Sequence, residues 1–466
     1  MASQVRRKPT YLKRKRRRRI NWGVLIPLLV LLFGISFGVT TLVLKWLEPE
    51  EVIYEYALDG LSVEESKAKL SNANIEDGEY KVSDYVLYGE SLTLYNGMYD
   101  LGVKDEMLGK SVLCRNLSTG SEYVFYLGNK LDEGIPIYEL PVGVYEVYVS
   151  SIMSNERLYM EKETFEEFYT VTRKGVNHKF SLIADTNYFY SDDATLDLEK
   201  PYVYFMVEDA ELPLGYYDII IDPGHFAYDC YASSCYGYID NGSVANNGTF
   251  IESEAVYKVS YVVARELALA GLRVTMTRDD ITPVDMYGEG GRVHKTITTK
   301  AKYFISNHLN AINDTRVHGS EVWHSAYAST AFAETILNTL VENTNLVASG
   351  NIGGGNPIPS IISSTVSTST YEKPFDGFMM IREPGGKGTG AGQLSEAAIE
   401  YNGPFLEGVN YGANALLIEY IYMTNKNDAA NWEEHYESYG KAVAKGIIDY
   451  LKLDFHENEL IEDEQE

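Results

Sequence analysis

The 466-residue sequence contains only three cysteines, Cys114, Cys230 and Cys235. Three cysteines are too few for the disulfide framework that stabilises many secreted domains. No CxxC spacing occurs, which excludes the common cysteine-based zinc motifs. We expect Cys114 to be buried. Cys230 and Cys235 are close enough in sequence either to pair or to remain free in a loop.

Acidic residues are absent from residues 1–45, which contain eleven Lys and Arg. The rest of the chain carries 29 basic against 67 acidic side chains, a formal charge of 29 − 67 = −38. An acidic surface of this size disfavours nucleic acid and anionic lipid as partners of that part of the chain. The basic N-terminal cluster therefore needs a separate explanation.

One long apolar run follows the basic cluster. Residues 22–44 carry no charge over 23 positions, which at ~1.5 Å per residue is enough to cross a ~30 Å hydrocarbon layer. A cleaved signal peptide would have a shorter apolar core and a small-residue cleavage site, which the sequence after Lys45 does not offer. We expect a transmembrane helix at 22–45, in a single-pass protein of the cell membrane. The basic cluster would then be the flank of this helix; the alternative explanation for the cluster is a nucleic-acid role for Arg14–Arg19.

Charge and composition divide the chain further. By the positive-inside rule, residues 1–21 form a basic cytoplasmic tail and everything after the span lies outside the cell. Residues 46–83 are expected to form an acidic stalk, and 455–466 a solvated acidic tail. Residues 84–210 alternate tyrosines with polar residues between Gly, Asn and Asp turns, which predicts a β-sandwich-like module. Alternating tyrosines favour core packing over a glycan-stacking surface.

From residue 212 to 454 the pattern becomes strand, helix, strand, helix. Apolar strands that alternate with helices predict an α/β domain with an open, mostly parallel sheet and helices on both faces. Residues 345–412 are too long for a simple connection, so we expect an insertion that acts as a lid, a cleft wall or a regulatory segment. Arg382 in this insertion either receives a substrate carboxylate or, as we expect, lies on the surface.

Four side chains stand at strand ends or helix starts in this domain: His225, Glu252, His308 and Glu419. In open α/β sheets, ligands bind at the carboxyl ends of the strands. An apolar helical stripe runs from Val256 to Leu267, and Glu252 lies one turn before it on the same stripe. A carboxylate buried there requires a partner. Two histidines and one carboxylate with an open fourth position are typical of a catalytic zinc.

These motifs resemble the zinc-dependent N-acetylmuramoyl-L-alanine amidases of the amidase-3 type. The resemblance rests on motifs that occur in the family's order and together span about half of the chain. They are Ile221-Asp222-Pro223-Gly224-His225, the helix-opening Glu252, Ser306-Asn307-His308-Leu309-Asn310, and Leu417-Ile418-Glu419 with Asn425.

The resemblance implies that His225, Glu252 and His308 bind one Zn²⁺ per chain. Glu419 would take the proton of a zinc-activated water, and Asn310 would orient His308. The implied substrate is peptidoglycan, cut between N-acetylmuramic acid and the L-alanine of the stem peptide. The site would lie outside the cell, and 84–210 or 345–412 could receive a protein regulator.

The sequence also departs from the family. Phe226-Ala227 replace the glycines that usually follow the first histidine, and the loop between His225 and Glu252 is enlarged. Two alternatives stay open: a catalytically silent wall-binding or regulatory module with the amidase fold, and another zinc exopeptidase on a related sheet. Intact ligand positions favour the hydrolase.

Overall fold

The computed structural model describes residues 12–13, 54–55, 76–96, 110–186, 200–228, 239–245, 248–286, 289–350, 360–366, 375–391 and 410–453. The predicted transmembrane helix at 22–45, most of the predicted stalk, Cys230, Cys235 and the acidic tail lie outside these residues. Within the described ranges, no helix combines the length and the apolar character needed to cross a membrane.

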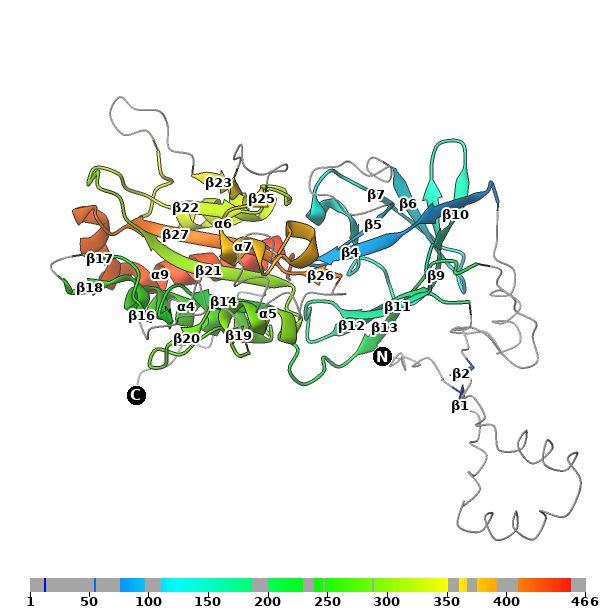
Figure 1. The fold of residues 1–466 in the computed structure, drawn as a ribbon, viewed down its shortest axis with the longest axis horizontal. Coiled ribbons are helices and arrows are strands. Elements are labelled where there is room, and N and C mark those ends of the chain that lie inside the picture. Colours follow the sequence, from blue (N-terminus) through cyan, green and yellow to red (C-terminus); the bar gives the residue numbers. More distant parts are fainter. Residues whose placement is uncertain are drawn as a thin grey trace, which may run out of the picture.

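Two domains lie side by side in Figure 1, a β-domain (described residues within 76–210) and an α/β domain (described residues within 216–453). The β-domain contains β3 (Glu79–Val82), β4 (Asp84–Tyr88), β5 (Ser91–Tyr95), β6 (Ser111–Asn116), β7 (Glu122–Tyr126), η1 (Leu131–Glu133), β8 (Ile135–Pro136), β9 (Gly143–Ser150), β10 (Asn155–Met160), β11 (Thr164–Tyr169), β12 (Asn177–Ala184) and β13 (Tyr204–Ala210). A separate pair is formed by β1 (Leu12–Lys13) and β2 (Tyr54–Glu55).

The β-domain consists of two sheets that share one core. The larger sheet has the order β11-β12-β13-β9-β10-β3, with β6 paired to β9 and β7 paired to β6. The smaller sheet has the order β26-β4-β5-β8, in which β26 (Tyr411–Gly412) comes from the C-terminal part of the chain. Tyr85, Tyr145 and the thiol of Cys114 are buried in the core between them, as expected from the alternating pattern. Strand β3 lies within the predicted stalk, so the β-domain begins before residue 84.

The α/β domain is built around the sheet β19-β14-β21-β27-β22-β23. Its strands are β14 (Ile219–Pro223), β19 (Val274–Met276), β21 (Tyr303–Asn310), β22 (Glu321–His324), β23 (Ile361–Ser363) and β27 (Asn414–Tyr422). Its helical elements are α4 (Glu252–Leu269), α5 (Arg292–Thr299), α6 (Ala331–Asn343), α7 (Met379–Arg382), η3 (Gly386–Thr389) and α9 (Lys426–Tyr450). Short strands complete it: β15 (Ala227–Tyr228), β16 (Ile239–Asp240), β17 (Val244–Ala245), β18 (Phe250–Ile251), β20 (Val284–Asp285), β24 (Thr365–Val366), β25 (Phe375–Asp376) and β26 (Tyr411–Gly412).

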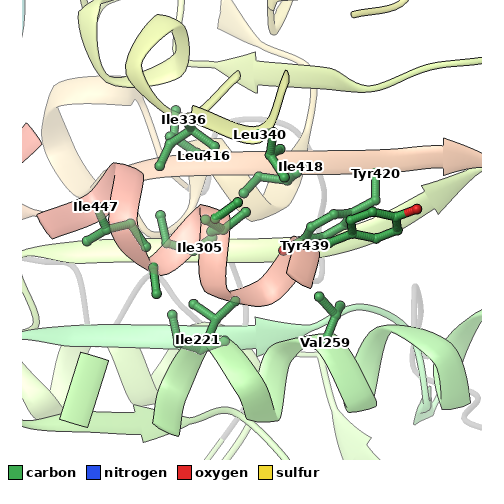
Figure 2. Close-up of a cluster of buried hydrophobic side chains, with 14 of the residues drawn as sticks. Ile221, Val259, Ile305, Ile336, Leu340, Leu416, Ile418, Tyr420, Tyr439 and Ile447 are labelled. Carbon is green, nitrogen blue, oxygen red and sulfur yellow. The ribbon is translucent and has the colours of Figure 1, made fainter. Parts of the chain in front are cut away.

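Helices cover both faces of this sheet, as the sequence predicts. Adjacent strands are parallel except for β22 against β27. On one face α4, α6 and α9 pack on Ile221, Ile305 and Ile418, as Figure 2 shows. On the other face α5 and α7 cover Ile220 and Phe304. Each fully buried aliphatic side chain of this kind contributes about 1.5–3 kcal/mol to stability.

The insertion joins the two domains. Its strand β23 extends the α/β sheet, and its strand β26 pairs with β4 in the smaller sheet of the β-domain. Arg382, expected on the surface, is only 2% exposed. It donates hydrogen bonds to Glu383 and to the Asp376 carbonyl, because α7 packs its side chain inside the insertion. The surface interpretation of Arg382 was therefore wrong.

The β-domain contacts the amino ends of the central strands. Asp218, directly before β14, accepts a hydrogen bond from the Thr172 N–H. At the start of β21, the Tyr303 hydroxyl lies 3.5 Å from Glu90 Oε2. The predicted ligands His225 and His308 belong to the carboxyl ends of the same two strands. The domain interface therefore lies at the amino ends of the central strands, and the candidate site lies at their carboxyl ends.

Candidate metal centre

The side chains of three predicted ligands come together at the carboxyl ends of the strands. His225 Nε2 lies 2.9 Å from Glu252 Oε1. His308 Nδ1 lies 3.2 Å from the same oxygen and 3.2 Å from His225 Nε2. In the described part of the chain this is the one group of three such ligands close enough to share a metal ion.

The spacing of these atoms fits zinc. Ligand atoms arranged tetrahedrally around Zn²⁺ at bonds of ~2.0–2.1 Å are about 3.3 Å apart. Two imidazole nitrogens and one carboxylate oxygen are also ligand types that zinc prefers. The donor set and its spacing thus fit a metal ion with a further position open.

Glu252 is fixed by the backbone around it. Helix α4 begins at this residue, which is only 3% exposed, whereas Glu254 points to solvent. Its Oε1 accepts the Leu309 N–H at 3.0 Å, and its Oε2 accepts the Ser243 N–H at 2.8 Å. Burial raises the pKa of Glu252, but hydrogen bonds from His225 and His308 outweigh burial and hold the pKa well below its usual range. Glu252 is therefore an anion in this site.

The two histidines differ in charge. Burial lowers the pKa of His225, but hydrogen bonds to Asp240 and Glu252 and their charges outweigh it and raise the pKa to about 9. Burial lowers the pKa of His308, with only a partial opposing effect of Glu252. Protonated His225 therefore carries a positive charge that attracts the Glu252 carboxylate, 2.9 Å away.

The loop that carries His225 has a strained backbone. His225 and Phe226 both have positive φ values, 61° and 52°, a conformation that costs most residues free energy. Arg278 holds the turn, since its guanidinium donates to the carbonyls of Pro223 at 3.0 Å and Gly224 at 2.9 Å. Sequence reasoning did not assign this role to Arg278, because nothing in the sequence signals a contact over 54 residues.

Glu419 stands beside the cluster on the neighbouring strand. Strand β27 pairs in register with β21, which places Glu419 opposite His308. Its Oε2 is shielded from solvent and has no hydrogen-bond partner among the described residues. Burial raises the pKa of Glu419 well above its usual range, and the charges of Glu252 and Glu321 add to this rise. Such a carboxylate accepts a proton more readily than an exposed glutamate does.

Glu321 is a further acid that sequence reasoning missed. Strand β22 places it opposite Glu419 on the other side of β27. Tyr422 donates its hydroxyl to Glu321, and the Asn310 amide donates to it at 3.0 Å. The described side-chain hydrogen bonds of Asn310 are with Glu321 and the Ala311 N–H, so its role in orienting His308 stays a prediction.

Comparisons with known proteins agree with the sequence motifs. Residues 219–365 match the family model described as N-acetylmuramoyl-L-alanine amidase. A search of curated protein sequences finds no match.

Among solved structures, the N-acetylmuramoyl-L-alanine amidase AmiC2 of Nostoc punctiforme is similar over 50% of this chain and 96% of its own, with 21% identity and a TM-score of 0.34. The catalytic domain of the amidase CwlV from Bacillus (Paenibacillus) polymyxa var. colistinus is similar over 50% and 98%, with 20% identity and a TM-score of 0.33. The amidase Ami1 from Mycobacterium smegmatis is similar over 50% and 96%, with 19% identity and a TM-score of 0.33.

Proposed function

We propose that this chain hydrolyses peptidoglycan at the amide bond between N-acetylmuramic acid and the L-alanine of the stem peptide, with one zinc ion held by His225, Glu252 and His308. The observation that carries the proposal is the cluster of three ligand atoms 2.9–3.2 Å apart. The cluster lies within the stretch that matches the amidase family model.

In this proposal three side chains hold the metal ion and Glu419 transfers the proton. A zinc ion held by the three ligands would acidify a water molecule and polarise the scissile carbonyl. Glu419 would take the proton from the attacking water at its carboxylate and pass it to the leaving amine nitrogen. The products are the lactyl carboxylate and a stem peptide with a free amino group on L-alanine.

The raised pKa of Glu419 supports this role. A proton acceptor in catalysis works best when its pKa lies near the working pH, and an ordinary exposed glutamate has too low a pKa for that. The unpartnered Oε2 of Glu419 is available for the proton. Glu321 on the neighbouring strand is less suited, because both of its oxygens already accept hydrogen bonds.

The test is digestion of purified peptidoglycan by the full chain, followed by mass spectrometry of the soluble products. We expect free stem peptides that begin with L-alanine, and a loss of at least about 100-fold in their release on Glu419→Gln, with zinc content unchanged. Glu433→Gln is the control, since Glu433 is an exposed carboxylate that pairs with Lys258. Undiminished release by Glu419→Gln, or no stem peptide from the wild type, would contradict the proposal.

We also propose that the chain is anchored in the cell membrane by residues 22–45, with residues 1–21 in the cytoplasm and the α/β domain outside. The uncharged run and the basic residues before it support this arrangement. The acidic protein and the anionic wall have charges of the same sign and do not attract each other, so a membrane tether would keep the protein close to the wall. Membrane fractionation and protease treatment of intact cells test it, and recovery of the full chain in the soluble fraction would contradict it.

A further inference from the structure

We propose that Asp240 is a positioning residue that fixes the ligand His225, and that the segment 239–245 acts as a clamp on two of the three ligands. The inference rests on the proposed function, because it concerns the same metal site. It assigns a role to the loop between His225 and Glu252, which the sequence shows only as an enlarged connection.

The first step is the orientation of the His225 ring. Asp240 Oδ2 lies 2.7 Å from His225 Nδ1, while His225 Nε2 faces the cluster, 2.9 Å from Glu252 Oε1. An ionised carboxylate can only accept a hydrogen bond, so the proton of neutral His225 is held on Nδ1. The lone pair of Nε2 is then directed at the position of the metal.

The second step is that Asp240 is itself fixed. The Gly242 N–H donates to Asp240 Oδ1 at 2.9 Å, and the Phe226 N–H donates to the Asp240 carbonyl at 2.6 Å. Strand β16, which ends at Asp240, pairs with β15 next to the histidine turn. The carboxylate therefore holds His225 from a backbone that is bonded to the same turn.

The third step is the contact of the same segment with Glu252. The Ser243 N–H donates to Glu252 Oε2 at 2.8 Å, and the Glu252 N–H donates to the Ser243 carbonyl at 3.0 Å. Between the two contacts, Gly242 has a φ of +68°, and a Cβ there would lie 2.5 Å from His225 Cδ2 and 2.6 Å from Glu252 Oε2. Only glycine allows the segment to approach both ligands so closely.

The third ligand shows why His225 needs this support. His308 belongs to the central strand β21, and its ring packs directly against Gly224. Its Nε2 has no hydrogen-bond partner in the described part of the chain, so the sheet backbone and steric contact fix it. His225 lies in a turn with two strained residues, where an unsupported ring would have several orientations.

The experiment measures zinc affinity of the full chain by competition with a chelator, for Asp240→Ala and Asp240→Asn. Loss of a carboxylate that supports a histidine ligand typically weakens metal binding about 10–100-fold. We expect Asp240→Ala to show that loss and Asp240→Asn a smaller one, because the Asn oxygen still accepts from Nδ1. The visible spectrum of the Co²⁺-substituted protein should also change in Asp240→Ala, since it reports ligand geometry.

A matched control exists in the β-domain. Asp209 Oδ1 lies 3.2 Å from His178 Nδ1 in another histidine–aspartate pair, so Asp209→Ala removes the same kind of pair far from the cluster. A general loss of stability would appear in both variants, whereas a role in positioning His225 changes zinc affinity and the Co²⁺ spectrum only in Asp240→Ala.

A second pair of variants keeps the test decisive if Asp240→Ala does not fold. Gly242→Ala places a Cβ against both ligands, while Gly248→Ala has the same kind of positive φ, +93°, with nothing within 4 Å. Weaker zinc binding in Gly242→Ala alone supports the clamp. Wild-type affinity in the Asp240 and Gly242 variants overturns it. A wild type that binds no zinc instead overturns the proposed function.

Discussion

Asp222 and Arg292 form a buried ion pair directly beneath the histidine turn, with Arg292 Nε 2.8 Å from Asp222 Oδ1 and Nη2 2.5 Å from Oδ2. Neither residue is more than 2% exposed. The Ser306 and Thr277 hydroxyls also donate to Asp222, each at 2.6 Å. One carboxylate therefore connects β14, β21 and α5 close to two of the proposed ligands.

Asp222→Asn should strongly destabilise the protein. It removes the carboxylate charge that faces the buried Arg292 guanidinium, and breaking a buried ion pair on one side costs about 3–5 kcal/mol in comparable sites. Denaturant titration of both proteins measures the difference in the free energy of unfolding. The control is Asp314→Asn, which breaks an exposed pair with Arg316 and should leave stability unchanged. A similar effect of both substitutions would contradict the prediction.

The same ion pair predicts how stability depends on pH. Burial raises the pKa of Asp222, but the Arg292 charge and the hydrogen bonds from Arg292, Ser306 and Thr277 outweigh it and hold the pKa well below its usual range. Since the folded pKa is depressed, the stabilisation is present above the unfolded value of about 3.9 and is lost as pH falls through the folded pKa. Wild type should lose stability in acid more steeply than Asp222→Asn.

Zinc affinity should rise with pH in the neutral range. In the metal-free site the pKa of His225 is about 9, so zinc must displace a proton from His225 below that pH. Affinity should therefore increase by up to about tenfold per pH unit from about pH 6 and level off above about pH 9. Chelator competition at each pH measures this. A constant affinity across the neutral range would show that His225 is not protonated in the free site.

Gly224→Ala should weaken zinc binding by displacing His308. A Cβ at this position would lie 2.4 Å from His308 Cε1 and 2.7 Å from the Asn307 carbonyl oxygen. The backbone of β21 cannot move away without breaking its ladders with β14 and β27, so the imidazole has to shift. Gly350→Ala is the control, because its Cβ would have only one neighbour, at 3.9 Å. Equal zinc affinity of the two variants would refute the steric argument.

Asp218→Ala should destabilise the protein without changing zinc affinity. The Asp218 carboxylate accepts the Thr172 N–H of the β-domain at 2.9 Å and the Arg273 N–H of the α/β domain at 2.7 Å. Each buried donor left without an acceptor costs about 1–3 kcal/mol. Denaturant titration and chelator competition on the same variant separate the two effects. Weaker zinc binding would show that the interface between the domains is coupled to the metal site at the other ends of the strands.

Some features of the site could be predicted because they depend on local pattern. The β-branched run before Asp222 predicts a buried strand that ends in a turn, and the apolar stripe of α4 predicts that Glu252 faces inward while Glu254 does not. Both features appear in the structure. Cys114, expected to be buried, is fully buried.

Other features could not be predicted from pattern. The amide of Asn310 on β21 donates to Glu321 on β22, across the intervening strand β27. Arg382 is buried within the insertion. It lies in a Gly-rich segment without hydrophobic periodicity, so no local pattern in the sequence indicates this burial.

The sequence by itself determined the order of the strands and helices, which side of α4 is buried, and the types of side chain available to hold a metal, because these depend on residue identity and on periods of two and 3.6. Only the tertiary structure decided that Asp240 supports His225, that Glu321 stands beside Glu419, and that β26 joins the sheet of the β-domain. These contacts depend on loop paths and strand register, which bring together residues with no common local pattern.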